Sequence, residues 1–101
     1  MDYHHQLQAG EPVQVTVLVE GEGGSPGTVA QSRNDNVELL IGKPAPFGAA
    51  VKLEGSDSLF LGEILSCRPE GDKFAVRVEL RHALYNTQEL ARLAKRILDS
   101  F

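Results

Sequence analysis

Cysteine and long apolar runs are scarce in this sequence of 101 residues. Cys67 is the single cysteine, which excludes a disulfide within the chain and favours a reducing compartment. No run approaches the roughly 18 apolar residues of a membrane span. The first 20 residues also lack a basic start followed by an apolar stretch, so no secretory signal is predicted. We therefore expect a cytoplasmic protein.

Positive charge and aromatic side chains are also in short supply. Ten Lys and Arg residues stand against 14 Asp and Glu residues, for a net charge of -4. A nucleic-acid binder normally carries a basic excess, and a barrel that binds single strands needs surface aromatics beside a basic groove. With only 4 Phe, 2 Tyr and no Trp, that reading is kept only as a second alternative. The length suits one compact domain.

Catalytic and metal-binding constellations are lacking as well. Gly23–Gly27 formally matches the G-x-S-x-G nucleophile elbow, but Pro26 and a strand-like stretch follow where a helix is needed, so we read it as a flexible loop. Cys67 and His82 have no orienting third group, and a structural thiol is the better interpretation. The neighbouring His4 and His5 point in different directions and do not make a metal site alone. The sequence predicts no enzyme and no metal site.

What the chain does contain is a succession of short strand patterns. Phe74, Val76, Val78 and Leu80 alternate with polar or small residues, and the stretch 59–67 is the partner strand of a hairpin. Arg68–Asp72 supplies the turn, through Pro69 and Gly71. Gly62 stands in mid-strand, where it weakens pairing unless a bulge or a neighbouring backbone needs the space. Further strands are predicted at 12–20, 28–31, 37–41 and 49–54, with a flexible connection at 21–27 and a polar turn at 32–36 in which Asn36 takes the left-handed conformation.

The hydrophobic period changes near the end of the chain. Asn86 can cap a helix whose third residue is Glu89, and an apolar stripe at three- and four-residue spacing follows. Its members are Leu90, Leu93, Ala94, Ile97, Leu98 and Phe101. We expect this helix, at 86–100, to close an opening of the barrel, so that ending the chain at Leu84 would destabilise the fold. Arg92, Lys95 and Arg96 share a helix flank, interpreted as a solvated basic face, with contact to an acidic partner as the alternative.

These patterns predict a mainly all-β fold: a small six-stranded antiparallel barrel with one C-terminal helix. Residues 1–11 form a polar lead-in that packs Tyr3 or Leu7 on the domain. Residues 12–101 form the single domain.

The order of these pieces resembles a PilZ domain, a bacterial module whose usual ligand is cyclic di-GMP. The resemblance covers residues 12–80 and implies a PilZ-like barrel with a signalling role. It rests on the strands PVQVTVLV, GTVA, VELLI and AAVKLE, the turn QSRNDN, the loop PAPFG, and the closing hairpin LGEILSCRPEGDKFAVRVEL.

The binding signature of that family is not matched. Its RxxxR motif ahead of the first strand is missing, because no arginine precedes Arg33. At its (D/N)xSxxG motif this chain has Gln31, Arg33 and Asn36 where Asp or Asn, Ser and Gly are expected, and Arg77 stands where a glycine is common. Losing two bidentate arginine contacts would cost roughly 2–6 kcal/mol of affinity.

The leading hypothesis is therefore a non-catalytic bacterial signalling or adaptor domain with a degenerate cyclic di-GMP site and no cofactor. It would dock onto another protein through the 31–36 turn or the C-terminal helix. The alternative is a cyclic di-GMP receptor that binds through Gln31, Arg33, Asn34 and Asn36.

Overall fold

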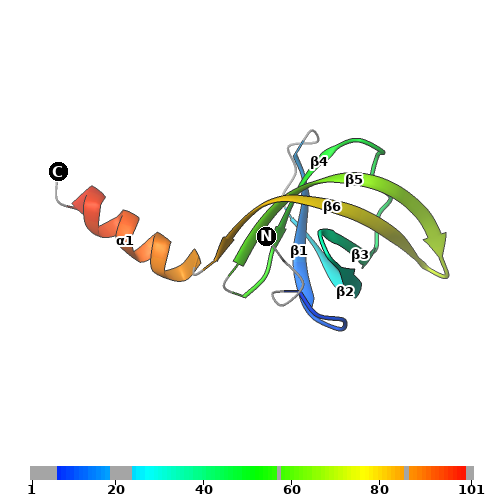
Figure 1. The fold of residues 1–101 in the computed structure, drawn as a ribbon, viewed down its shortest axis with the longest axis horizontal. Coiled ribbons are helices and arrows are strands. Elements are labelled where there is room, and N and C mark those ends of the chain that lie inside the picture. The colour runs from blue at the N-terminus through cyan, green and yellow to red at the C-terminus, as the bar shows by residue number, and fades with distance from the viewer. Residues whose placement is uncertain (1–6, 19–23, 57, 86, 100–101) are drawn as a thin grey trace.

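Six antiparallel strands close into a barrel in the computed structural model, which describes residues 7–18, 24–56, 58–85 and 87–99. Around the barrel the strands follow the order β1-β2-β3-β6-β5-β4, and β1 pairs with β4 to complete the ring (Figure 1). The elements are β1 (Pro12–Val17), β2 (Ser25–Arg33), β3 (Asn36–Ile41), β4 (Ala50–Glu54), β5 (Ser58–Glu70), β6 (Lys73–Tyr85) and α1 (Thr87–Asp99). The predicted six-stranded barrel with one C-terminal helix is confirmed.

The core lies inside the barrel and is built by strand alternation, which sends every second side chain inward. Phe60, Leu39 and Leu53 are fully buried there. Leu7 joins the same cluster from ahead of β1, as predicted for the lead-in, while Tyr3 lies outside the described residues. The lead-in is also tied to β2, because the backbone nitrogen of Gly10 donates to the carbonyl oxygen of Val29 at 2.7 Å. The packed body of the domain thus includes Leu7.

Gly62 lies opposite a bulge of β6, one of the reasons foreseen for a glycine in mid-strand. Leu61 pairs with His82 but Gly62 pairs with Leu80, which leaves Arg81 without a partner in the ladder. The missing side chain also makes room for the backbone of Glu79. Such a bulge bends the strand and increases its twist, as a closed barrel requires.

The connections are shorter than predicted between β5 and β6, ahead of β2, and between β2 and β3. The turn expected at 68–72 is a two-residue connection, because β5 runs to Glu70 and β6 begins at Lys73; Gly71 has φ 62°, which suits the first position of a tight hairpin turn. β2 likewise begins at Ser25, so part of the expected 21–27 loop pairs with β1. A Cβ at Gly27 would lie 2.9 Å from Cγ2 of Ile41, so glycine fits this crowded strand.

The left-handed residue in the β2–β3 turn is Asn34, with φ 55°, and not Asn36 as predicted. Asn36 is the first residue of β3 and pairs with Arg33. The turn is therefore only two residues long, and asparagine is the residue besides glycine that tolerates this conformation best.

α1 does not close the barrel, so that prediction is wrong. Leu93 and Ile97 are each 50% exposed and Leu98 is 71% exposed. β6 continues to Tyr85, five residues past the predicted strand end at Leu80, and carries the helix away from the core (Figure 1). The molecule is accordingly elongated, with extents of 50 × 28 × 21 Å. Buried side chains of the lead-in and the strands, Leu7 and Phe60 among them, fill the interior instead.

Candidate ligand site on the outer barrel wall

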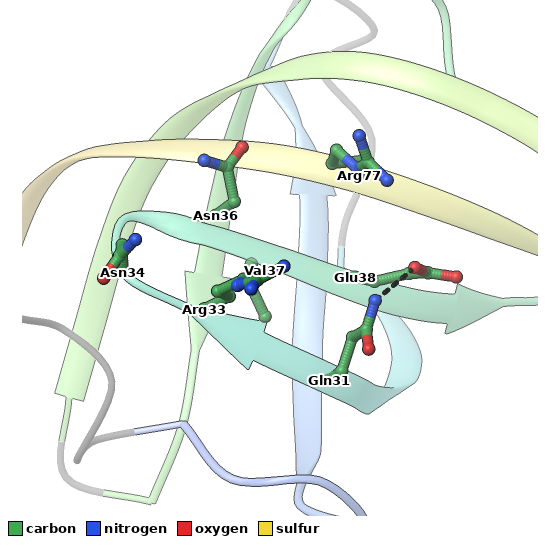
Figure 2. Close-up of a pocket in the computed structure, with 7 residues that line it drawn as sticks. All are labelled: Gln31, Arg33, Asn34, Asn36, Val37, Glu38 and Arg77. Carbon is green, nitrogen blue, oxygen red and sulfur yellow. Dashed lines mark hydrogen bonds between the residues drawn. The ribbon is translucent and has the colours of Figure 1, made fainter.

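The four residues predicted to bind a ligand line one hollow on the outer wall of the barrel. Gln31, Arg33, Asn34 and Asn36 surround a space of about 250 Å³ (Figure 2). Three further residues complete its lining: Val37, Glu38 and Arg77. The structure thus brings the predicted residues together, and adds a contribution from β6.

Strand register explains this grouping. A bulge between Val29 and Gln31 shifts the end of β2, so that Gln31 pairs with Glu38 and Arg33 with Asn36. Ser32, between the two outward residues, pairs with the buried Val37 and faces the interior. Its hydroxyl oxygen is buried and has no hydrogen-bond partner among the described residues. On the other side, β6 places Arg77 directly opposite Glu38.

Glu38 is the most enclosed charged side chain of the hollow. Nε2 of Gln31 donates to its Oε2 at 3.1 Å, and Nη2 of Arg68 donates to its Oε1 at 3.1 Å. The side chain of Glu38 is only 13% exposed, whereas that of Arg68 is 56% exposed. The Glu38 carboxylate is one of the side chains that line the hollow, so its negative charge opposes an anion that enters.

Arg77 was missed as a site residue by the sequence analysis, which noted it only as a departure from a family glycine. It is exposed and stands on the polar face of the 74–80 strand. The alternation of that strand already put Arg77 outward. What the sequence could not supply is the pairing of β6 with β3, which sets Arg77 beside Glu38 and in the same hollow as Arg33.

The side chains that line the hollow offer groups that can bind a ligand. Two guanidinium groups and three side-chain amides can donate to phosphate or carbonyl oxygens. Cys67 and His82 are not brought together, because Cys67 pairs with Val76 while His82 is six residues further along β6, about 20 Å away. Cys67 packs against the core and its sulfur lies 3.5 Å from the backbone nitrogen of Ala45, as expected of a structural thiol.

Metal ligands are likewise not gathered in the described part of the chain. Residues 7–18, 24–56, 58–85 and 87–99 contain no group of three or more His, Cys, Asp or Glu side chains that could hold an ion. His4 and His5 lie outside these ranges. Within them, the structure contains no helix of the length and apolar character that a bilayer crossing requires.

Comparisons with models of protein families, with curated proteins and with solved structures gave no match to this chain.

Proposed function

We propose that this chain is a non-catalytic bacterial signalling adaptor of the PilZ type, which docks onto another protein through α1. The observation that carries the proposal is the exposure of Leu93, Ile97 and Leu98 on one helix. Burying an apolar side chain of this size contributes about 1.5–3 kcal/mol, and the barrel of the same chain does not provide that burial. Contiguous exposed apolar surface of this kind is typical of a docking face. We assign the function to the cytoplasm, because Cys67 is a free thiol.

The charges in the hollow disfavour binding of a dinucleotide, which is the alternative to docking. Arg33 and Arg77 are cationic, but Glu38 stands between their strands and is held in place by Gln31 and Arg68. A ligand with two phosphates would have to approach this carboxylate or displace it. The family's paired arginines ahead of the first strand are also missing. Weak or no binding of cyclic di-GMP is the expected result.

A position-specific cross-linking experiment tests the docking role. A photoreactive amino acid is placed at Ile97 or, as the control, at Arg92, which lies about 140° around the helix from Ile97. Each full-length chain is produced in its own bacterial host and irradiated. We expect a discrete cross-linked product from position 97 that Leu93→Glu abolishes, and much less from position 92. Equal products from both positions, or none from either, would contradict docking through this face.

A second candidate function is a cyclic di-GMP receptor that uses the same hollow. The observation that favours it is that Arg77 lines the same hollow as Arg33, which provides two guanidinium groups where the sequence predicted one. Calorimetric titration with cyclic di-GMP decides between the two. Binding at micromolar or tighter concentration that is abolished by both Arg33→Ala and Arg77→Ala, and not by Arg92→Ala, would establish the receptor. No heat of binding at millimolar ligand would exclude it.

A further inference from the structure

Three leucines form an apolar patch on the outer wall of the barrel, close to the start of α1. Leu59 on β5 pairs directly with Leu84 on β6, and Leu61 follows two residues along β5 on the same face. Leu84 is 52% exposed, and Leu59 and Leu61 are half-buried. We call Leu59, Leu61 and Leu84 the leucine patch. Leu59 and Leu84 present one apolar surface across the two strands, and Leu61 extends it along β5, where the exposed His82 of β6 lies opposite.

Carboxylates border this patch at both ends. Glu54 on β4 pairs with Leu59, and its side chain is 45% exposed. Beyond Leu61, Glu63 and Glu79 face each other across β5 and β6. Nη2 of Arg81 contacts both, at 3.0 Å from Oε1 of Glu63 and 2.9 Å from Oε1 of Glu79, so two carboxylates share one guanidinium group. Nζ of Lys52 forms an ion pair with Oε1 of Glu54 at 3.3 Å. Three carboxylates against two cations leave the border negative.

α1 carries the complementary pattern. Lys95 and Arg96 stand at opposite borders of its exposed apolar stripe, each about 60° around the helix from the nearest apolar side chain, Leu98 and Leu93 respectively. The lengths also agree: Leu93 to Ile97 spans about 6 Å along a helix, and Leu59 to Leu61 about 7 Å along a strand. Over residues 92–99 the apolar stripe therefore has basic borders, which complement an apolar patch with acidic borders.

The patch and the helix of one chain are poorly placed to meet each other. Only residue 86 separates Tyr85 from Thr87, and α1 leaves the barrel at the end of the same strand that carries Leu84 (Figure 1). A connection that reverses the chain between a strand and a helix usually takes two to six residues. The α1 helix of a second copy is not tied to this barrel by a short connection, so it can approach the leucine patch.

We infer that α1 of one copy docks on the leucine patch of a second copy, and that the exchange is reciprocal. Each chain then gives a helix and receives one, which makes a closed two-fold dimer from two identical interfaces. This inference rests on the proposed function in one respect, namely that α1 is the docking element. It names another copy of this chain as the partner.

Solution mass, measured by size-exclusion chromatography with light scattering, tests the exchange. We expect twice the monomer mass for the full chain, and the monomer mass for both Ile97→Glu on the helix and Leu61→Glu on the patch. Mixing these two variants should restore a dimer, because the helix of the Leu61→Glu chain and the patch of the Ile97→Glu chain are both intact. Arg92→Glu, on the far side of the helix, is the matched control and should stay dimeric. Leu61→Gln repeats the patch test with an uncharged side chain, and the circular dichroism melt of each variant checks that the barrel is folded.

Three results would overturn the inference. One is a monomeric full chain at high micromolar concentration. The second is a Leu61→Glu chain that stays dimeric while Ile97→Glu does not, since the helices would then pair with each other. The third is a monomeric chain that binds vesicles of phosphatidylglycerol in a way that depends on Ile97, because a lipid surface would then be the partner. A cross-link from position 97 to a different protein would still support the adaptor role in each case, so the two proposals fail separately.

Discussion

Gly62 on β5 lies against the backbone carbonyl of Glu79 on β6, so closely that a Cβ atom at position 62 would overlap the carbonyl oxygen. The same glycine marks the bulge at which the β5–β6 register shifts. Past this bulge the two strands continue together to Ser58 and Tyr85, and this extension carries the leucine patch and leads into α1. The leucine patch and α1 thus both lie beyond the point at which Gly62 meets the backbone of Glu79.

Replacing Gly62 by alanine should destabilise the barrel. The methyl group would meet backbone atoms of Glu79, which cannot rotate away, so we expect a loss of about 1–3 kcal/mol in the free energy of unfolding. Urea denaturation measures it. Gly42→Ala is the matched control, because a Cβ at Gly42 meets nothing within 4 Å, and it should be neutral or slightly stabilising. Equal effects at both positions would show that the contact with Glu79 is not the cause.

Removing α1 should leave the stability of the barrel nearly unchanged. The exposed Leu93, Ile97 and Leu98 contribute little burial, so a chain that ends after Tyr85 should unfold within about 0.5 kcal/mol of the full chain. The comparison belongs at a dilution where both chains are monomeric, because a dimer gains stability from association. Leu7→Ala gives the contrast, since truncating this fully buried side chain should cost about 2–5 kcal/mol. A similar loss on removal of α1 would mean that the helix packs on its own barrel.

Neutralising Glu38 should make the hollow a better anion site. Glu38→Gln removes the negative charge from a lining that also contains Arg33 and Arg77, and we expect affinity for inorganic phosphate or cyclic di-GMP to rise by about 1 kcal/mol, or roughly fivefold. Stability should change by less than about 1 kcal/mol, because the ion pair of Glu38 with Arg68 is largely solvated on the arginine side. Calorimetric titration and urea denaturation measure the two effects.

Glu70→Gln is the control for this charge change. Glu70 contacts the same Arg68 at 3.3 Å but does not line the hollow. A gain in anion affinity that is equal for Glu38→Gln and Glu70→Gln would reflect net charge alone, and would remove the hollow from consideration as a ligand site.

Replacing Ser32 by alanine should stabilise the protein by about 1 kcal/mol. Its hydroxyl oxygen is buried without a hydrogen-bond partner among the described residues, and an unsatisfied buried polar group costs free energy that alanine does not incur. Ser66→Ala, at an exposed position of β5, should have no effect on the midpoint of thermal unfolding. A lower midpoint for Ser32→Ala would indicate that the hydroxyl group is satisfied in solution.

The strands were predictable because their signal is local. Val13, Val15, Leu39, Leu53 and Val78 each stand in a period-2 pattern within one short segment, and each is buried. The role of Gly62 followed from the same logic, since a glycine in mid-strand needs a bulge or a close backbone. Loop lengths were less accurate, because the pairing of Ser25–Gly27 with β1 depends on how closely the barrel closes and not on their own propensities.

The residues of the candidate site likewise fall into two groups: those that the sequence places together and those that only strand pairing brings in. Gln31, Arg33, Asn34 and Asn36 are neighbours in the chain, so a single turn keeps them together whatever the rest of the fold does. Arg77 reaches the same region because β6 pairs with β3, and Arg68 reaches it because β5 pairs with β6. The first of these pairings joins strands that are far apart in the sequence. No local pattern contains that register.

By itself, the sequence determined a mainly β domain of six strands with a terminal amphipathic helix, because apolar periodicity depends only on the residues within each segment. Only the tertiary structure decided that Arg77 joins the 31–38 hollow, that Leu59 meets Leu84, and that α1 stands clear of the core. The physical reason is that barrel closure fixes register between distant strands, and that register alone determines which outward side chains become neighbours.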